Sequence, residues 1–201
     1  MSRTLIIYGT RYGATASTSE EIAKVLRGEG FEVRVVNSKE DDVRDIAEYE
    51  LVIVGSGMQI EMWTGEANRF LKKFHGELAK KKVGLFVSSG VQAIIKHEGK
   101  LDEIERTRRK YLEEKAIKYG LQPLALGMFG GVWDFNRLPW WSKKAMATTK
   151  QQLEAAGFKE TKSGFYDTRD WETIREWATE IARKVKSPNS GNILPEISAS
   201  L

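Results

Sequence analysis

The chain contains no cysteine, and this absence removes a large part of protein chemistry. No thiol nucleophile, disulfide, thiolate metal site or iron–sulfur cluster can form without that residue. The chain has only 2 histidines, His75 and His97, so a histidine-rich metal site is not expected either. We therefore expect no metal ligands, and any redox chemistry would have to come from an organic cofactor.

Long apolar runs are also lacking, since none approaches the roughly 18 residues of a membrane-spanning helix. The first residues lead directly into an apolar strand, so we expect neither a signal peptide nor a transmembrane helix, and we expect a cytoplasmic location. The net charge is +4 with a pI of about 9.1. Basic residues cluster at Lys80–Lys82, Arg106–Lys110 and Lys143–Lys144, and no aromatic platform interleaves with these clusters, which argues against nucleic acid. An anionic small substrate, or peripheral contact with an anionic membrane surface, suits them better.

The 201 residues alternate between short apolar runs and helical patterns. The strand-like runs are Leu5–Tyr8, Phe31–Val36, Leu51–Val54, Val83–Val87 and Leu124–Phe129. Helices are predicted between them, over about Thr15–Arg27, Gly65–Phe74 and Leu101–Tyr119. This alternation predicts an α/β protein with a doubly wound, five-stranded parallel sheet in the flavodoxin-like order 2-1-3-4-5.

The last third of the chain departs from the alternation. Residues from about 132 to 168 are rich in tryptophan and lysine and predict an insertion after or within the fifth strand. A strong amphipathic helix follows, with Asp170 in position to cap its N-terminus. We expect a single domain over residues 1–186 and a flexible tail over residues 187–201.

The first strand runs into a segment that has the composition of a phosphate-binding loop, which reads Thr10-Arg11-Tyr12-Gly13-Ala14-Thr15. Gly9 and Gly13 allow a tight turn, the threonine hydroxyls can donate to phosphate oxygens, and a helix N-terminus follows. A Walker loop would need a lysine where Ala14 follows Gly13, and a dinucleotide loop would need a glycine where Arg11 stands. A phosphate monoester is the best remaining ligand, the alternative being an ordinary strand-to-helix turn.

Two further loops are expected beside this one, because ligands bind outside the carboxyl ends of parallel strands at the switch point. The candidate residues are Ser56, Gly57, Met58, Gln59, Ile60 and Trp63 after the third strand, and Ser88, Ser89, Gly90, Val91 and Gln92 after the fourth. The apolar and aromatic side chains of the first of these loops favour a flat aromatic ligand. Alternatively, Met58, Ile60 and Trp63 are anchors that pack onto the sheet.

At these motifs the chain resembles the flavodoxin-like FMN proteins, and among them the menaquinone-dependent protoporphyrinogen dehydrogenases. The likeness rests on the Thr10–Thr15 loop, on Phe129-Gly130-Gly131 before the insertion, and on Asp167-Thr168-Arg169-Asp170-Trp171-Glu172 at the last helix. The resemblance implies FMN, with its phosphate at Thr10–Thr15 and its ring between the loops after the third and fourth strands. It also implies that the Gly57–Met58 peptide lies beside the flavin ring.

Two functions remain open. One is an oxidoreductase that passes electrons from a reduced organic substrate through FMN to a quinone, and the other is a one-electron carrier between redox partner proteins. The positive net charge favours the oxidoreductase, because cations stabilise an anionic reduced flavin. The tryptophans of the insertion form a lid for a flat anionic substrate, an interface anchor that reaches towards a lipid-soluble quinone, or part of the core. No catalytic residue is assigned, and His97 is either a proton donor or a surface side chain.

Overall fold

The computed structural model describes residues 2–59, 61–137 and 143–187. Its centre is a sheet of five parallel strands in the order β2-β1-β3-β5-β6, which confirms the predicted topology. The strands are β1 Arg3–Gly9, β2 Glu32–Asn37, β3 Leu51–Gln59, β5 Lys82–Ser88 and β6 Ala125–Phe129. A two-residue strand, β4 Met62–Trp63, turns back antiparallel on the end of β3.

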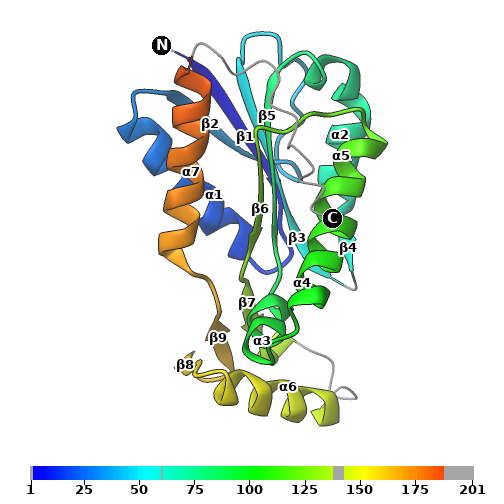
Figure 1. The fold of residues 1–201 in the computed structure, drawn as a ribbon, viewed down its shortest axis with the longest axis vertical. Coiled ribbons are helices and arrows are strands. Elements are labelled where there is room, and N and C mark those ends of the chain that lie inside the picture. The colour runs from blue at the N-terminus through cyan, green and yellow to red at the C-terminus, as the bar shows by residue number, and fades with distance from the viewer. Residues whose placement is uncertain (1, 60, 138–142, 188–201) are drawn as a thin grey trace, which may run out of the picture.

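Helices cover both faces of the sheet, which explains why its central strands are apolar throughout instead of alternating. Helices α1 Ala14–Gly28 and α7 Trp171–Lys186 lie on one face, and α2 Gly65–Leu78 and α5 Glu114–Lys118 on the other (Figure 1). Each face has its own buried cluster, with Ile22 and Ile181 in one and Phe70 and Leu71 in the other. The two remaining helices of this region are α3 Val91–His97 and α4 Leu101–Arg108.

The long helix predicted over Leu101–Tyr119 is interrupted by a π-helical turn, Arg109–Glu113, between α4 and α5. Tyr111 and Leu112 in this turn are buried against the sheet. The carbonyl of Tyr111 accepts a hydrogen bond of 2.9 Å from Nε1 of Trp63. The π turn therefore joins this helical segment to β4, next to the candidate site.

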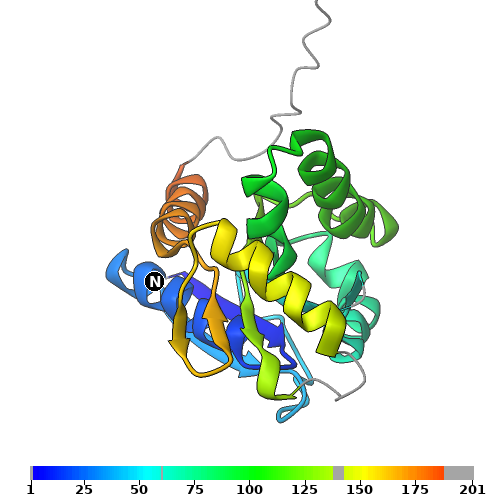
Figure 2. The same ribbon diagram turned by 90° about the horizontal axis from the view of Figure 1, so that it is seen from below.

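The segment predicted as an insertion forms a small unit of its own at the carboxyl end of the sheet. It contains β7 Val132–Asp134, a 3-10 turn Phe135–Arg137, α6 Lys143–Ala155, β8 Glu160–Lys162 and β9 Phe165–Asp167. The three strands pair antiparallel in the order β7-β9-β8. Helix α6 lies across the end of the molecule where the parallel strands finish (Figures 1 and 2).

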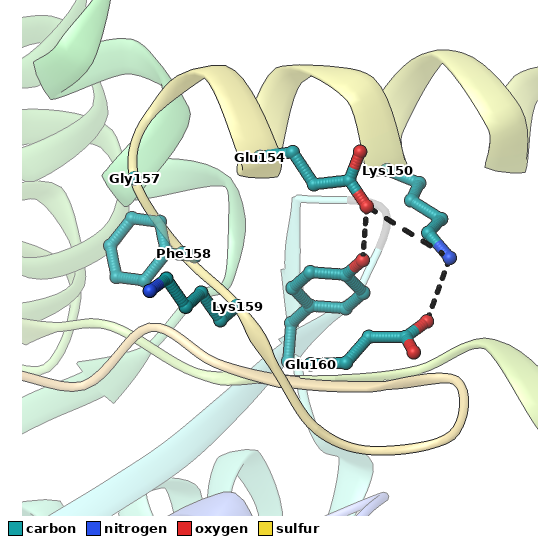
Figure 3. Close-up of a pocket in the computed structure, with 7 residues that line it drawn as sticks. Lys150, Glu154, Gly157, Phe158, Lys159 and Glu160 are labelled. Carbon is teal, nitrogen blue, oxygen red and sulfur yellow. Dashed lines mark hydrogen bonds and ion pairs between the residues drawn. The ribbon is translucent and has the colours of Figure 1, made fainter.

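A buried tyrosine anchors α6 to this small sheet. Tyr166 is fully buried, and its hydroxyl donates a 2.8 Å hydrogen bond to Oε1 of Glu154 on α6 (Figure 3). Lys150 lies between Glu154 and Glu160, at 3.9 Å and 2.7 Å, and ties the helix to β8. Burial raises the pKa of Tyr166, with a smaller contribution from its hydrogen bond to Glu154. The hydroxyl is thereby kept as a neutral donor.

Within the described part of this segment, Trp133 and Phe135 do not extend the core over the fifth parallel strand. Trp133 and Phe135 stack with ring centroids 5.9 Å apart and pack against Ile94 of α3 and Tyr166. They form a third, smaller apolar cluster at the carboxyl end of the sheet. Trp140 and Trp141, the other two tryptophans that the sequence proposed as a lid or core element, lie outside the described residues.

Candidate functional site

The three predicted loops meet because their strands end side by side. Gly9 of β1 pairs with Ser56 of β3, and Gly57 of β3 pairs with Ser88 of β5. A Cβ atom built on Gly57 would lie only 3.0 Å from Oγ1 of Thr15. The end of β3 and the start of α1 are therefore in contact, and the third loop follows directly from the neighbouring strand.

The loop Thr10–Thr15 has a defined internal geometry. Oγ1 of Thr10 accepts a 2.9 Å hydrogen bond from the backbone N–H of Gly13. Gly13 has φ +88°, a left-handed conformation that favours glycine. Helix α1 begins at Ala14 with no side chain capping its N-terminus, so no capping oxygen occupies the first N–H groups of the helix. A free helix N-terminus of this kind attracts anions.

Thr15 provides the most direct sign of a ligand-binding site. Its side chain is 1% exposed, and its Oγ1 has no hydrogen-bond partner among the described residues. A buried hydroxyl without a partner costs about 1–3 kcal/mol, so such groups are usually satisfied by a ligand or water. Thr18 is also buried with an unpartnered hydroxyl, but it lies one turn further along α1. Thr15, by contrast, lies beside Gly57, where the first and second loops meet.

The remaining residues of this loop lie at the surface. Arg11 is exposed, Tyr12 is 37% exposed, and Ala14 is half-buried. A Cβ atom on Gly57 would lie 3.8 Å from the backbone nitrogen of Arg11, so the main chain of the loop, rather than the Arg11 side chain, faces β3. Their assignment to the cofactor stays a prediction.

In the second loop Ser56 is fully buried, and its hydroxyl links the loop to the start of α2. Its Oγ accepts a 2.9 Å hydrogen bond from the backbone N–H of Thr64 and donates one of 3.1 Å to the carbonyl of Gly57. Thr64 in turn caps α2, where its side chain accepts from the N–H of Ala67 at 3.4 Å. Ser56 thus holds the peptide after Gly57 in one orientation and is itself held by the start of α2.

The structure describes only part of the rest of this loop. Met58 is half-buried, and Gln59 is the last residue of β3. The predicted site residue Ile60 lies outside the described residues, as does the side chain of Gln59. Glu61, which follows, has φ +57° and forms an ion pair with Lys110 of the π-helical turn.

The prediction that Trp63 offers an aromatic face to a flat ligand is wrong. Its side chain is only 4% exposed and belongs to the main core. Its Nε1 is bonded to the carbonyl of Tyr111, and the ammonium of Lys115 lies 5.4 Å from the ring centroid. Antiparallel pairing of β4 with β3 turns Trp63 inward, because alternate residues of a strand point to opposite faces. It is a core anchor, the alternative that the sequence had left open.

The third loop is tightly placed between the sheet and the insertion. Ser88 and Ser89 are buried, and the N–H of Ser89 donates a 2.9 Å hydrogen bond to the carbonyl of Phe129. A Cβ atom on Gly90 would lie 2.4 Å from Nε1 of Trp133, so this glycine is needed for the insertion to approach. Val91, the first residue of α3, is 46% exposed.

Sequence reasoning missed the part that Arg169 plays here. Its side chain is 8% exposed and forms an ion pair with Asp167 at 2.5 Å. Its guanidinium also donates to the carbonyl of Ala14 at 3.2 Å and to the hydroxyl of Ser17, both in the first turn of α1. These partners are more than 150 positions away in the sequence, and nothing in the local pattern around Arg169 indicates the contact.

Other predicted features can be placed briefly. His97 is exposed at the end of α3, outside the three loops. Within the described residues there is no group of three or more histidines and acidic side chains that could hold a metal ion. No helix in the described part of the chain is long and apolar enough to cross a membrane.

The parallel sheet and its three converging loops define a doubly wound α/β protein with a candidate phosphate-ester site at the carboxyl ends of its strands. The model of the flavodoxin domain family matches residues 5–160 of this chain. The chain therefore belongs to the flavodoxin domain family.

Individual relatives are distant. A protoporphyrinogen IX dehydrogenase (quinone) from Escherichia coli (strain K12) is 23% identical over 186 residues, covering 92% of this chain and 98% of that protein. Oxidised flavodoxin 1 from Bacillus cereus is 16% identical with a TM-score of 0.55, covering 90% of this chain and 98% of that one. The rubredoxin oxygen:oxidoreductase of Desulfovibrio gigas is 18% identical with a TM-score of 0.54, and the 92% of this chain that aligns spans 36% of its length.

Proposed function

We propose that this protein is an FMN-dependent oxidoreductase of the flavodoxin type that passes electrons from a reduced organic substrate to a quinone. The observation that carries the proposal is the buried, unpartnered hydroxyl of Thr15 at the uncapped N-terminus of α1. That arrangement fits a phosphate ester held by neutral donors and a helix dipole. The distant protoporphyrinogen dehydrogenase relative supports the reaction class.

The residues present fit FMN. The Thr10–Thr15 loop would hold the phosphate, and the loops that end in Met58 and Gln92 would border the ring. FMN would supply the electron-accepting ring system, while the protein supplies binding, orientation and electrostatics. Ser56 would keep the Gly57 peptide in a fixed orientation beside the ring, because its hydroxyl is bonded to that carbonyl.

Local charge supports the oxidoreductase over the carrier. Glu61 and Glu66 are the acidic residues that the sequence places near the second loop, and each has a cationic partner. Glu61 pairs with Lys110, and Glu66 lies 3.6 Å from Arg69. Paired carboxylates exert a weaker field on the ring than free ones, so they oppose an anionic reduced flavin less.

One observation favours the carrier as a second candidate. An exposed apolar side chain lies in or next to each of the three loops. Tyr12 of the first loop is 37% exposed, Val91 of the third is 46% exposed, and Met62, which follows the second, is 59% exposed. Exposed apolar side chains around a site can mark a docking surface for a partner protein. Stepwise anaerobic reduction of the FMN-loaded protein separates the two functions, since an oxidoreductase of this kind would take up two electrons in one transition and a carrier in two resolved transitions.

The cofactor assignment is tested by titrating FMN and riboflavin into the protein and into the Thr15→Val variant. We expect FMN affinity to fall about tenfold or more in the variant, because a hydrogen bond to a charged group contributes about 1.5–3 kcal/mol. Riboflavin, which lacks the phosphate, should bind equally to both proteins. Thr18→Val is the matched control, a buried threonine of the same helix with the same unpartnered hydroxyl. Equal FMN affinity in all three proteins would refute the assignment.

A further inference from the structure

A tryptophan and a tyrosine of the insertion lie directly opposite each other on neighbouring strands. In the antiparallel pairing of β7 with β9, Trp133 is the partner of Tyr166. Residues paired in this way project from the same face of a sheet, with Cβ atoms about 4.5–5.5 Å apart. The ring of Phe135 stacks on that of Trp133, with centroids 5.9 Å apart, and meets the ring of Tyr166 edge-on at 5.7 Å. The three side chains form a continuous aromatic path, which we call the Trp133–Tyr166 chain.

One end of the Trp133–Tyr166 chain lies against the third loop. A Cβ atom built on Gly90 would lie 2.4 Å from Nε1 of Trp133, so the indole nitrogen lies next to the backbone of this loop. In a protein without cysteine, tryptophan and tyrosine are among the side chains that lose a single electron most readily. Trp133 is therefore a nearby electron donor for an oxidant bound at the third loop.

The other end of the chain has a route for a proton to solvent. The hydroxyl of the buried Tyr166 donates its 2.8 Å hydrogen bond to Glu154, whose side chain is 52% exposed (Figure 3). An ionised carboxylate is an acceptor and can take up the proton of that hydroxyl. Lys150 lies 2.7 Å from Glu160 but 3.9 Å from Glu154, so its charge is engaged mainly by Glu160. Glu154 can therefore receive a proton from Tyr166 and release it to water.

The two aromatic residues differ in where their protons can go, and this difference gives the chain a direction. Nε1 of Trp133 is buried and has no hydrogen-bond partner among the described residues. If Trp133 loses an electron, its N–H proton has no acceptor, so the indole stays a cation. A cation withdraws an electron from a neighbour more strongly than a neutral radical does. Tyr166 can supply that electron because Glu154 takes its proton at the same time.

We propose that the Trp133–Tyr166 chain carries a one-electron oxidising equivalent away from the third loop to Tyr166. First, a one-electron oxidant at the loop, a class that includes light-excited aromatic cofactors, gains an electron and leaves Trp133 as a radical cation. Tyr166 then gives an electron to Trp133 and its hydroxyl proton to Glu154. The products are an intact Trp133, a neutral tyrosyl radical and a protonated Glu154. The oxidising equivalent thus leaves the candidate site before it can damage the loops.

The test places an oxidant at the third loop without any cofactor. Because the chain has no cysteine, Val91→Cys supplies a single thiol, at a side chain that is 46% exposed. A ruthenium tris-bipyridine maleimide attached there becomes a one-electron oxidant when it is flashed with light in the presence of a cobalt(III) complex. We expect electron paramagnetic resonance of the labelled full chain to show a tyrosyl radical. Tyr166→Phe should remove that signal and leave a tryptophan radical.

Two further variants of the labelled protein test the path. Trp133→Phe should abolish the tyrosyl radical, because phenylalanine is not oxidised under these conditions. Glu154→Gln should slow the formation of the radical, followed by transient absorption, because a neutral amide takes up a proton poorly. Tyr166→Phe keeps the buried ring and Glu154 lies at the surface, so both of these variants decide the question even if Trp133→Phe fails to fold.

The matched controls are Trp171→Phe, at the start of α7, and Tyr12→Phe, at the exposed tyrosine of the first loop. Both should leave the yield and rate of the radical unchanged. Absence of a tyrosyl radical, its persistence in Tyr166→Phe, its loss in Tyr12→Phe, or an unchanged signal in Trp133→Phe or Glu154→Gln would overturn the proposal. Because the assay needs no FMN, failure of the proposed function would appear separately, as absence of FMN binding.

Discussion

At the scale of single residues, the candidate site depends on a glycine, Gly9, as much as on larger side chains. A Cβ atom on Gly9 would lie 1.9 Å from Oγ1 of Thr64, which caps α2 and contacts Ser56. Only a bare backbone lets the end of β1 approach the start of α2 so closely. Gly9 therefore controls the spacing between the Thr10–Thr15 loop and the second loop.

We expect Gly9→Ala to lower the free energy of unfolding by about 1–3 kcal/mol, since an overpacked side chain forces its neighbours to move. Urea denaturation measures the change. Gly76→Ala is the control, because Gly76 is exposed within α2 and a Cβ atom there meets nothing within 4 Å. That substitution should raise the free energy of unfolding by about 0.5–1 kcal/mol. Destabilisation by both substitutions to the same extent would contradict the steric explanation.

At the scale of elements, the start of α7 joins the insertion to the sheet and depends on its cap. The carboxylate of Asp170 accepts hydrogen bonds from two backbone N–H groups and from Oγ1 of Thr173, the last at 2.8 Å. The hydrogen bond from Thr173 Oγ1 is the largest of the causes that lower the pKa of Asp170, followed by the backbone bond from the same residue. The cap is therefore strongest when this carboxyl is ionised.

Replacing Asp170 with alanine should lower the free energy of unfolding by about 1 kcal/mol at neutral pH. Because the pKa is lower in the folded than in the unfolded state, this contribution is complete above the ordinary value of about 3.9 and is lost as the pH falls through the native pKa. The difference in free energy of unfolding between the two proteins, followed by urea denaturation from pH 7 to pH 2.5, should therefore shrink on acidification. Glu176→Ala, on the exposed face of the same helix, should show no such difference at either pH.

At the scale of the whole molecule, Arg169 connects the insertion, the last helix and the first helix. It is bonded to Asp167 at the end of β9, to Ala14 and Ser17 in α1, and it lies over the ring of Trp171. Its bonds to Ala14 and Ser17 tie the first turn of α1 to the C-terminal third of the chain. The position of the helix N-terminus should therefore depend on this side chain.

We expect Arg169→Met to lower the free energy of unfolding by about 2–3 kcal/mol, because it leaves the partly buried Asp167 carboxylate without its cation. It should also weaken FMN binding, measured by fluorescence titration at a temperature where the variant remains folded by circular dichroism. The control is Arg175→Met, which removes another contact between α7 and α1, the pair with Glu21, whose arginine is 54% exposed. That variant should change FMN affinity little, and an equal loss in both would mean that Arg169 has no special position.

Some of these features follow from local sequence and others do not. The five parallel strands, their order and the helices between them were predicted correctly, because buried strands and amphipathic helices have apolar periods that depend only on near neighbours. The π-helical turn at Arg109–Glu113 was not predicted, since its contacts are with distant parts of the chain. Its Tyr111 is buried against the sheet and accepts a hydrogen bond from Trp63. Trp63 itself was assigned to the ligand because the sequence does not reveal on which side of β4 it lies.

The sequence alone determined the sheet order, the convergence of three loops and the chemistry available there, because strand pattern, glycine positions and loop composition are properties of short segments. It also ruled out thiol chemistry, because the chain has no cysteine. Only the tertiary structure decided that Trp63 points into the core, that Arg169 reaches the first turn of α1, and that the insertion encloses a cavity against α3. These are contacts between residues far apart in the chain, and they depend on how whole elements pack, which no local pattern records.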